Sequence, residues 1–327
     1  MESNPESTFS QAVQQEEQIT NDNAGDQNGQ KLQKLYDQGT LFFTKEMLLA
    51  TRDQMREIRA GKSDVFISKN FLGEPVVFRV KKGVVVGEPD GEWDVKSFSS
   101  YGYPSSLTLG SFVFTNTQQI AGQTFQEIKS RDCYADSTDP GYASISICTP
   151  PRKDEKFMAM ESKTPDETEK GFRRAIHDWH ASEDCSKLKS IIAGFMKDRP
   201  TWEIKYVAGF AFGALSSKYA KEKWARTVQF QHALLFTLGN TLPGKQKKCF
   251  VQDPCYTDVD RLVLGKFNIG VLDDPEGVLK VDSSTVVCSI CPSTALKQMF
   301  CDLWQDKLQW PPIIIWFPVG YDDSDLR

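Results

Sequence analysis

The second half of the chain alternates between short apolar runs and longer stretches with helical periodicity. The apolar runs are rich in Val and Ile, as are buried strands of a parallel sheet, in which both faces are covered. We expect strands at residues 204–208, 249–252, 269–272, 285–290 and 313–317, and helices at 224–238, 258–264 and 294–304. Strands that alternate with helices form parallel βαβ units with right-handed crossovers. The pattern predicts an α/β fold with a doubly wound, mostly parallel, Rossmann-like sheet.

The first of these strands leads into a turn with two glycines. Gly209 and Gly213 form a G-x-x-x-G pattern directly after Ile204–Ala208. A missing Cβ lets backbone N–H groups approach a ligand, and a strand, a glycine turn and a helix N-terminus form an anion-binding crevice. Ser216 and Ser217 follow, with hydroxyls or amides that could face a phosphate or carboxylate. The same glycines also fit a turn that merely packs closely.

Polar side chains follow three later strands, at the positions where such sheets bind ligands. Asp253 follows the second strand, where an acid can accept hydrogen bonds from a ribose; alternatively, it caps the next turn. Asp273 and Asp274 follow the third strand and could recognise a base or ribose or bind a metal, but an Asp-Asp-Pro-Glu-Gly run also fits an ordinary turn, which we favour. Ser289 lies near the end of the fourth strand, in the expected wall of the crevice.

The cysteines and histidines form no recognisable metal or catalytic site. Cys288 and Cys291 would point to opposite faces of an extended strand, and a zinc site would need a second, suitably spaced pair. His177 and His180 lack the glutamate of an H-E-x-x-H pattern, which favours a solvated or core-edge pair. His232 could touch a ligand or donate a proton, or it could pack between helix and sheet. We expect no metal and identify no catalytic residue.

Charge is distributed unevenly along the 327 residues, whose net charge is −5. Residues 1–30 hold six of the 44 acids and no Lys or Arg, which leaves 38 acids against 39 bases in the rest. The nearly neutral body offers no strong field for nucleic acid or an anionic membrane. No signal peptide or membrane span is evident, and the eight cysteines are expected to be reduced, in the cytoplasm or nucleus.

Residues 31–160 show several short strand patterns. A helix is expected to begin near Thr44, and the turn Lys81-Lys82-Gly83 predicts a hairpin between its two flanking strands. The expected strands are 65–68, 76–80, 84–86, 107–115 and 143–148. Further on, Thr164-Pro165-Asp166-Glu167 predicts a capped helix start, and Ser182 opens a second helix.

These patterns divide the chain into three parts. We expect residues 1–30 to form a disordered acidic and polar tail, residues 31–160 a strand-rich accessory region, and residues 161–327 a Rossmann-like domain.

Four segments resemble the sensitivity-to-red-light-reduced (SRR-like) domain family: Tyr206–Leu215, Gln231–Leu235, Val251–Tyr256 and Thr285–Pro292. In that family a glycine-containing strand end is followed by a helix with Gln and apolar residues, then an Asp-Pro strand end and a late Pro-containing turn. The resemblance covers about residues 170–320 and is closest to the fungal branch, although Cys-Pro-Ser replaces the Pro-His-Cys turn of plant and animal members. It implies regulation, associated with light and clock signalling in plants and with haem-synthesis control in animals, and no agreed enzymatic activity.

We therefore expect an intracellular regulatory protein with a nucleotide-binding-like crevice and with protein partners, but with no direct binding to nucleic acid or membranes. The candidate ligand contains adenosine, as S-adenosylmethionine does. The predicted crevice residues are Gly209, Gly213, Ser216, Asp253, Asp273 and Ser289. One alternative is an S-adenosylmethionine-dependent methyltransferase. Another is a non-catalytic interaction scaffold, in which Phe210, Phe212 or Trp224 fills the crevice.

Overall fold

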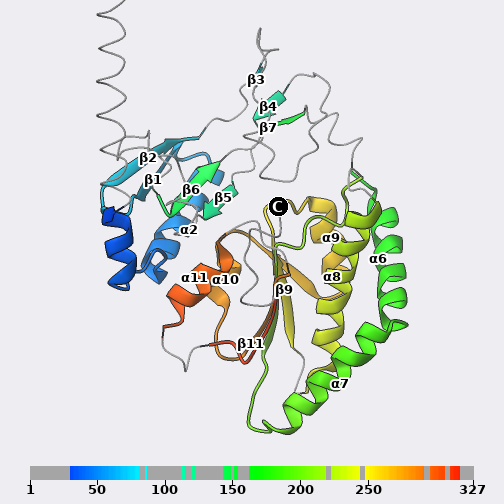
Figure 1. The fold of residues 1–327 in the computed structure, drawn as a ribbon. Coiled ribbons are helices and arrows are strands. Elements are labelled where there is room, and N and C mark those ends of the chain that lie inside the picture. The colour runs from blue at the N-terminus through cyan, green and yellow to red at the C-terminus, as the bar shows by residue number, and fades with distance from the viewer. Residues whose placement is uncertain are drawn as a thin grey trace, which may run out of the picture.

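Five parallel strands form the central sheet of the protein (Figure 1). A computed structural model describes residues 30–80, 85–86, 112–114, 119–122, 143–148, 151–153, 162–218, 222–243, 247–290, 295–305 and 310–316. The strands of the sheet are β8 (Tyr206–Phe210), β9 (Lys248–Gln252), β10 (Ile269–Leu272), β11 (Thr285–Cys288) and β12 (Ile313–Ile315). Their spatial order is β10-β9-β8-β11-β12, and every neighbouring pair is parallel. The predicted parallel α/β sheet is confirmed.

Helices cover both faces of this sheet, as Figure 1 shows. On one face lie α6 (Pro165–His180), α7 (Glu183–Lys197), α8 (Glu222–Thr241) and α9 (Asp258–Lys266). The other face carries α10 (Glu276–Lys280) and α11 (Leu296–Leu303). The side chains of β11 alternate between the two layers, since Val286 and Cys288 pack on the α8 side and Val287 packs on the α11 side. Both faces of the sheet are thus buried, which explains the apolar strands.

The capping signals in the sequence are confirmed at three helix starts. Thr164 and Glu167 form a complete capping box at the start of α6, and Pro165 occupies its first turn. Ser182 caps α7, and Thr44 caps α2 (Lys45–Arg59). These side chains satisfy backbone N–H groups that a helix leaves without partners, so each boundary is encoded locally.

The accessory region contains short antiparallel strands. In chain order they are β1 (Val65–Lys69), β2 (Pro75–Arg79), β3 (Val85–Val86), β4 (Phe112–Phe114), β5 (Gln119–Gly122), β6 (Ile145–Cys148) and β7 (Pro151–Lys153). The predicted hairpin through residues 81–83 is wrong, because β2 pairs with β1, and β3 pairs with β4. Asn70 explains the correct hairpin: its side-chain oxygen accepts from the N–H groups of Leu72 and Glu74, and Gly73 adopts φ +85°. Residues 81–83 lie outside the described residues.

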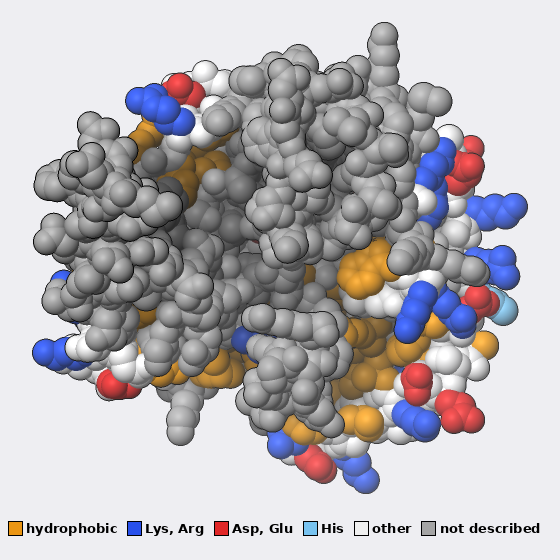
Figure 2. Space-filling view, turned by 45° about the horizontal axis from the view of Figure 1, so that its top comes forward, with side chains coloured by type: hydrophobic (Ala, Val, Ile, Leu, Met, Phe, Trp, Pro, Cys, Tyr) orange, Lys and Arg blue, Asp and Glu red, His pale blue; other side chains and the backbone are white. Residues whose placement is uncertain are grey.

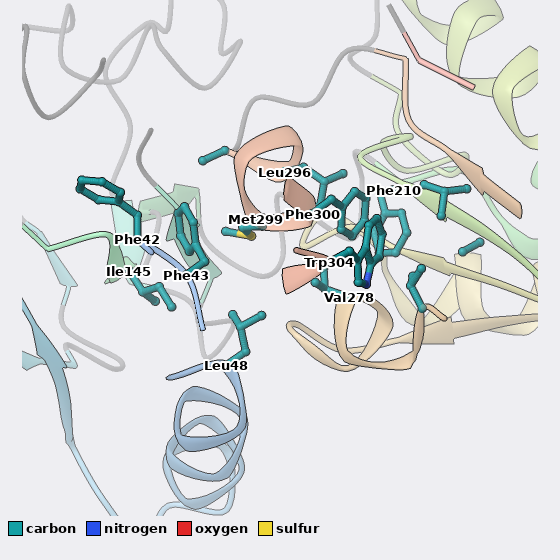
Figure 3. Close-up of a cluster of buried hydrophobic side chains, with 14 of the residues drawn as sticks. Phe42, Phe43, Leu48, Ile145, Phe210, Val278, Leu296, Met299, Phe300 and Trp304 are labelled. Atoms are coloured by element: carbon teal, nitrogen blue, oxygen red, sulfur yellow. The ribbon is translucent and has the colours of Figure 1, made fainter. Parts of the chain in front are cut away.

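The accessory region and the α11 face of the sheet share one hydrophobic cluster (Figure 3). Phe43, Leu48 and Ile145 lie in the same cluster as Met299 and Phe300 of α11. The Asp302 carboxylate on α11 also accepts hydrogen bonds from the backbone N–H groups of Phe42 and Phe43, at 2.9 and 3.0 Å. The proposed domain boundary near residue 160 stays a prediction, and these contacts join the regions on its two sides.

The surface of the described residues carries both signs of charge. Figure 2 shows basic and acidic side chains interspersed along the right-hand margin, the side on which α6 lies in Figure 1. On α6, Arg173 pairs with Glu169, and Glu169 also pairs with Lys266 of α9. In the part of the chain that the structure describes, no helix combines the length and apolar character needed to cross a bilayer.

Candidate functional site

The strand order reverses between β8 and β11. The chain proceeds from β8 outward through β9 to β10, then returns to place β11 on the other side of β8 and β12 beyond it. Parallel sheets with such an order bind ligands beyond the carboxyl ends of the strands at this switch point. Gly209 pairs with Cys288 at the ends of the two central strands, and Ser289 is the next residue of the chain. These positions define the candidate site.

Gly209 lies within β8 and not in the following turn, because the strand extends two residues further than predicted. A Cβ on Gly209 would stand 2.6 Å from the ring of Phe212 and 3.0 Å from Leu235. The missing side chain therefore admits the Phe212 ring, which is buried in the layer beneath α8. Contact between Gly209 and a ligand stays a prediction.

Gly213 and Asp253 contact each other although they are 40 positions apart in the chain. Gly213 has φ +78°, a left-handed conformation that suits glycine, and its N–H donates to Asp253 Oδ2 at 2.7 Å. Asp253 Oδ1 accepts from the N–H of Cys255 at 2.8 Å, so the carboxylate also caps the following turn, as the alternative interpretation holds. Burial raises the pKa of Asp253, although the two backbone N–H groups favour its charged form. Recognition of a ribose by this carboxylate remains untested.

Ser216 belongs to a buried network around Asp260. Its hydroxyl lies 2.9 Å from Asp260 Oδ2 and 2.9 Å from Thr257 Oγ1, and its N–H donates to Asp260 Oδ1 at 2.9 Å. Asp260 also completes the capping box at the start of α9 with Thr257. The backbone N–H of Lys163 donates to the Ser216 carbonyl at 2.8 Å, which ties the segment before α6 to the same loop. Sequence reasoning identified Ser216 but missed Asp260, whose Thr-x-x-Asp spacing after β9 was the available signal.

His232 is completely buried between α8 and the sheet. Its Nδ1 lies 2.7 Å from the Val228 carbonyl oxygen and its Nε2 lies 2.8 Å from the Tyr256 hydroxyl. Since a carbonyl only accepts, Nδ1–H donates to it and Nε2 accepts from Tyr256. Burial lowers the pKa of His232 to about 4 and raises that of Tyr256, so both are neutral near pH 7. This arrangement matches helix–sheet packing, the second interpretation of His232, and Tyr256 was missed in the sequence.

The adjacent acids Asp273 and Asp274 have different environments. Asp273 faces two arginines, Arg261 at 2.5 Å and Arg59 of α2 at 3.3 Å. Asp274 accepts a hydrogen bond from the side-chain amide of Gln252, and its pKa is raised to about 7, first by burial and then by the charge of Asp253.

The backbone at these acids forms the expected turn. The N–H of Glu276 donates to the Asp273 carbonyl at 2.7 Å, and the short helix α10 follows at once. Gln252 Oε1 accepts from the N–H of Gly277 at 2.6 Å, so this side chain fixes the entry into α10. Neither α10 nor the role of Gln252 was predicted, because a helix of five residues has too few positions to show a periodicity.

Ser289 differs from the other predicted site residues because its hydroxyl has no hydrogen-bond partner among the residues that the structure describes. The side chain is fully buried, and its oxygen makes no hydrogen bond in the described structure. Its backbone N–H donates to the Ile315 carbonyl at 2.9 Å, which extends the ladder to β12. The side-chain oxygen Oε1 of Gln231, on α8, is likewise buried and unpartnered. A buried polar group without a partner costs about 1–3 kcal/mol, so each requires an explanation.

The predicted site residues therefore separate into groups. Gly213 and Asp253 form one contact, Ser216 joins Asp260, Asp273 pairs with arginines, and Gly209 and Ser289 lie at the switch point. Among the described residues, no three His, Cys, Asp or Glu side chains are grouped as metal ligands would be; Cys291 lies outside the described residues.

Comparison with known proteins identifies one family. The family model described as the SRR1 domain matches residues 191–323, which include the whole five-stranded sheet. No curated protein and no solved structure matches the chain.

Proposed function

Because the SRR1 domain model matches residues 191–323, we propose that the protein is a regulatory protein that binds an adenosine-type ligand. The ligand would occupy the switch point between β8 and β11, and its binding would control contacts with protein partners. The match to this family, whose resemblance implies regulation, supports a regulatory role. The strand order supports the location, because ligands of doubly wound sheets bind where that order reverses.

The unpartnered hydroxyl of Ser289 is the observation that carries this proposal. It is buried one residue beyond the Cys288–Gly209 pair, at the carboxyl end of a central strand. A serine hydroxyl both donates and accepts hydrogen bonds. Ribose hydroxyls can do the same, and the adenine amino group donates. A bound ligand of this type would remove the cost of leaving the Ser289 hydroxyl unpaired.

The experiment compares two serines with opposite environments. We would measure thermal unfolding of the full chain with S-adenosylmethionine, its demethylated product, a nicotinamide dinucleotide or ATP. A ligand at about a hundred times its Kd stabilises the fold by roughly 2.7 kcal/mol. Ser289→Ala should remove this shift while leaving the free protein equally stable or slightly more stable, since the lost hydroxyl has no partner.

Ser216→Ala provides the matched control. Its hydroxyl bonds to Asp260 and Thr257, so its loss should destabilise the free protein by about 1–3 kcal/mol and leave the ligand-induced shift in place. If none of the ligands shifts the well-folded wild-type protein, or if Ser289→Ala retains the full shift, the adenosine-site proposal is rejected.

A second candidate function is a non-catalytic interaction scaffold. The burial of Phe210 and Phe212, at 2% and 1% exposure, favours it, because their rings fill space next to the central strand ends. Trp224 differs, being 53% exposed. The scaffold function would be favoured over the ligand-binding function if none of the ligands bound and the protein still regulated its pathway in cells.

A further inference from the structure

A second candidate binding site lies at the opposite, amino-terminal end of the sheet. A hollow of about 690 Å³ opens between the end of α7, the segment that leads into β8, and the start of β9. Small-molecule sites typically have volumes of about 300–1,000 Å³. The hollow is lined by aromatic and basic side chains, among them Arg199, Trp202, Lys205, Tyr206 and Lys248.

Lys248 lines this hollow beside Tyr206, and Lys280 lies over the ring of Tyr206. Tyr206 of β8 and Lys248 of β9 are directly paired across the sheet, so their side chains lie on the same face. The ammonium of Lys280, at the end of α10, lies 5.4 Å from the centre of the Tyr206 ring and 5.3 Å from that of Phe250. Neither Lys248 nor Lys280 has an acidic partner within the described ranges. Lys248 therefore brings an uncompensated positive charge to the wall of the hollow, and Lys280 brings a second one to the Tyr206 ring.

Arg199 adds a third cation without an acidic partner in the described chain. Its guanidinium carbon lies 3.9 Å from the centre of the Phe195 ring and 5.0 Å from that of Trp202. Stacking on these rings restrains the planar group and leaves its N–H donors available, apart from a contact of 3.5 Å with the Phe195 carbonyl. A restrained guanidinium is well suited to bind a phosphate through two parallel hydrogen bonds.

Two carboxylates offset part of this charge. Glu203 lies 3.5 Å from Lys205, and the charge of Lys205 also contributes to lowering the pKa of Asp282, after the hydrogen bonds from Ser284 and Thr285. Three cations, Arg199, Lys205 and Lys248, and one acid, Glu203, thus line the hollow, and only Lys205 is paired with an acid. Lys280 lies beside the hollow, over the Tyr206 ring. The net charge of the side chains at the hollow is therefore positive, although the net charge of the whole chain is −5.

We propose that this hollow binds a small ligand with a diphosphate or a comparable multivalent oxyanion. A multivalent anion would relieve the repulsion between the unpaired cations. The site is separated from the switch point by the length of the central strands, so the proposal does not depend on an adenosine ligand there. A free diphosphate and a nucleoside diphosphate share the required chemistry.

The test measures binding of inorganic pyrophosphate and of ADP to the full chain by calorimetry at low salt. We expect pyrophosphate to bind, and its affinity to fall as salt rises. Lys248→Gln combined with Lys280→Gln should weaken it at least tenfold, as should Arg199→Gln. The control Lys62→Gln with Lys69→Gln removes equal charge from exposed positions near β1 and should change the affinity less than twofold.

The two sources of diphosphate give distinct results. Tighter binding of ADP than of pyrophosphate, lost in the Lys248/Lys280 variant and retained in Ser289→Ala, would identify a nucleotide; equal binding of both would identify the diphosphate group alone. If ADP binding is lost only in Ser289→Ala, ADP binds at the switch point. The proposal is overturned if pyrophosphate does not bind at millimolar concentration, or if the control variant weakens binding as much as the hollow variants. Thermal unfolding without ligand confirms that each variant is folded.

Discussion

Gly209 and Gly213 are four residues apart, yet the chain needs glycine at each for a different reason. At Gly209 the requirement is space, since the Phe212 ring occupies the position of a side chain. At Gly213 the requirement is conformation, since φ is +78° and its N–H must reach Asp253. The sequence alone offered a ligand-binding turn or a close-packed turn, and both glycines make internal contacts that the second interpretation describes.

Replacement of Gly209 by alanine should therefore destabilise the protein. The new Cβ would stand 2.6 Å from the Phe212 ring, and the buried ring has little room to move, so we expect a loss of about 1–3 kcal/mol in urea denaturation. Gly194→Ala is the matched control: nothing lies within 4 Å of its Cβ, and it lies inside α7. That variant should gain roughly 0.5–1 kcal/mol. Equal stability of the two variants would contradict the packing role of Gly209.

Asp274 should make stability depend on pH. Its pKa is raised to about 7 in the folded state, against an ordinary value of 3.8, so the folded protein binds more protons than the unfolded chain between these values. The contribution is fully present below pH 3.8 and is lost as pH rises through 7, with a slope of at most about 1.4 kcal/mol per pH unit.

Asp274→Asn keeps an oxygen for the Gln252 amide and cannot ionise. The variant should therefore lose less stability than the wild type between pH 5 and pH 8 in chemical denaturation. Parallel pH curves for the two proteins would show that Asp274 does not titrate in this range.

The sequence predicted where the candidate site lies better than it predicted which residues contact one another there. Strand ends are visible as apolar runs, which placed Asp253 and Ser289 at the carboxyl edge. The partners of these residues depend on contacts across the fold, such as Asp253 with Gly213, or Ser216 with Asp260, and no local pattern specifies them. The absence of a partner for the Ser289 hydroxyl is equally invisible in a sequence.

Helix starts with local capping signals were predicted correctly, whereas the strand that pairs with β2 was not. The starts of α6 and α7 follow from Thr164 and Ser182, which bond to backbone groups three residues away. The pairing of β2 differs from the prediction, since its partner is β1 and not β3. Both Lys81-Lys82-Gly83 and Asn70–Glu74 contain a glycine, so the glycine alone does not show which of the two is the hairpin turn. Asn70 forms that turn with its own side chain.

Asp302 is expected to hold the accessory region against α11. Its carboxylate accepts from two backbone N–H groups, and Asp302→Ala would leave both without their partner, at a cost of about 1–3 kcal/mol. Hydrogen exchange should accelerate at Phe42 and Phe43 and along α2, while β8 keeps its protection. Asp302→Asn retains one acceptor oxygen and should have a smaller effect. Unchanged exchange in Asp302→Ala would show that the apolar contacts alone hold the two regions together.

At the scale of the whole molecule, two hydrophobic clusters lie on the two faces of one sheet. The cluster beneath α8 is built from residues of the Rossmann-like portion alone, whereas the cluster at α11 also includes Leu32, Phe42 and Phe43 from the chain before α2. The fold class followed from strand and helix periodicity, which is a property of each segment. The shared cluster could not be predicted from the sequence, because the position of an apolar residue in the chain does not show which face of the sheet it packs against.

Two truncations should therefore differ in their effect. Removal of residues 1–29 should leave the free energy of unfolding nearly unchanged, because their composition is polar and acidic. Removal of residues 1–43 also deletes Leu32, Phe42 and Phe43, which are 1%, 6% and 0% exposed, and should cost several kcal/mol. Thermal and urea unfolding measure both. A large loss in the shorter truncation would show that the tail is a structural element.

The central position of β8 has a consequence for synthesis of the chain on the ribosome. One edge of this strand is covered by β9, but the other remains without hydrogen-bond partners until β11, which begins roughly 75 residues after β8 ends. At about 5–20 residues per second, that edge stays open for several seconds while the polypeptide is elongated. An apolar strand with an open edge can pair with other chains, so this interval is when the nascent protein is most prone to aggregate and most dependent on chaperones.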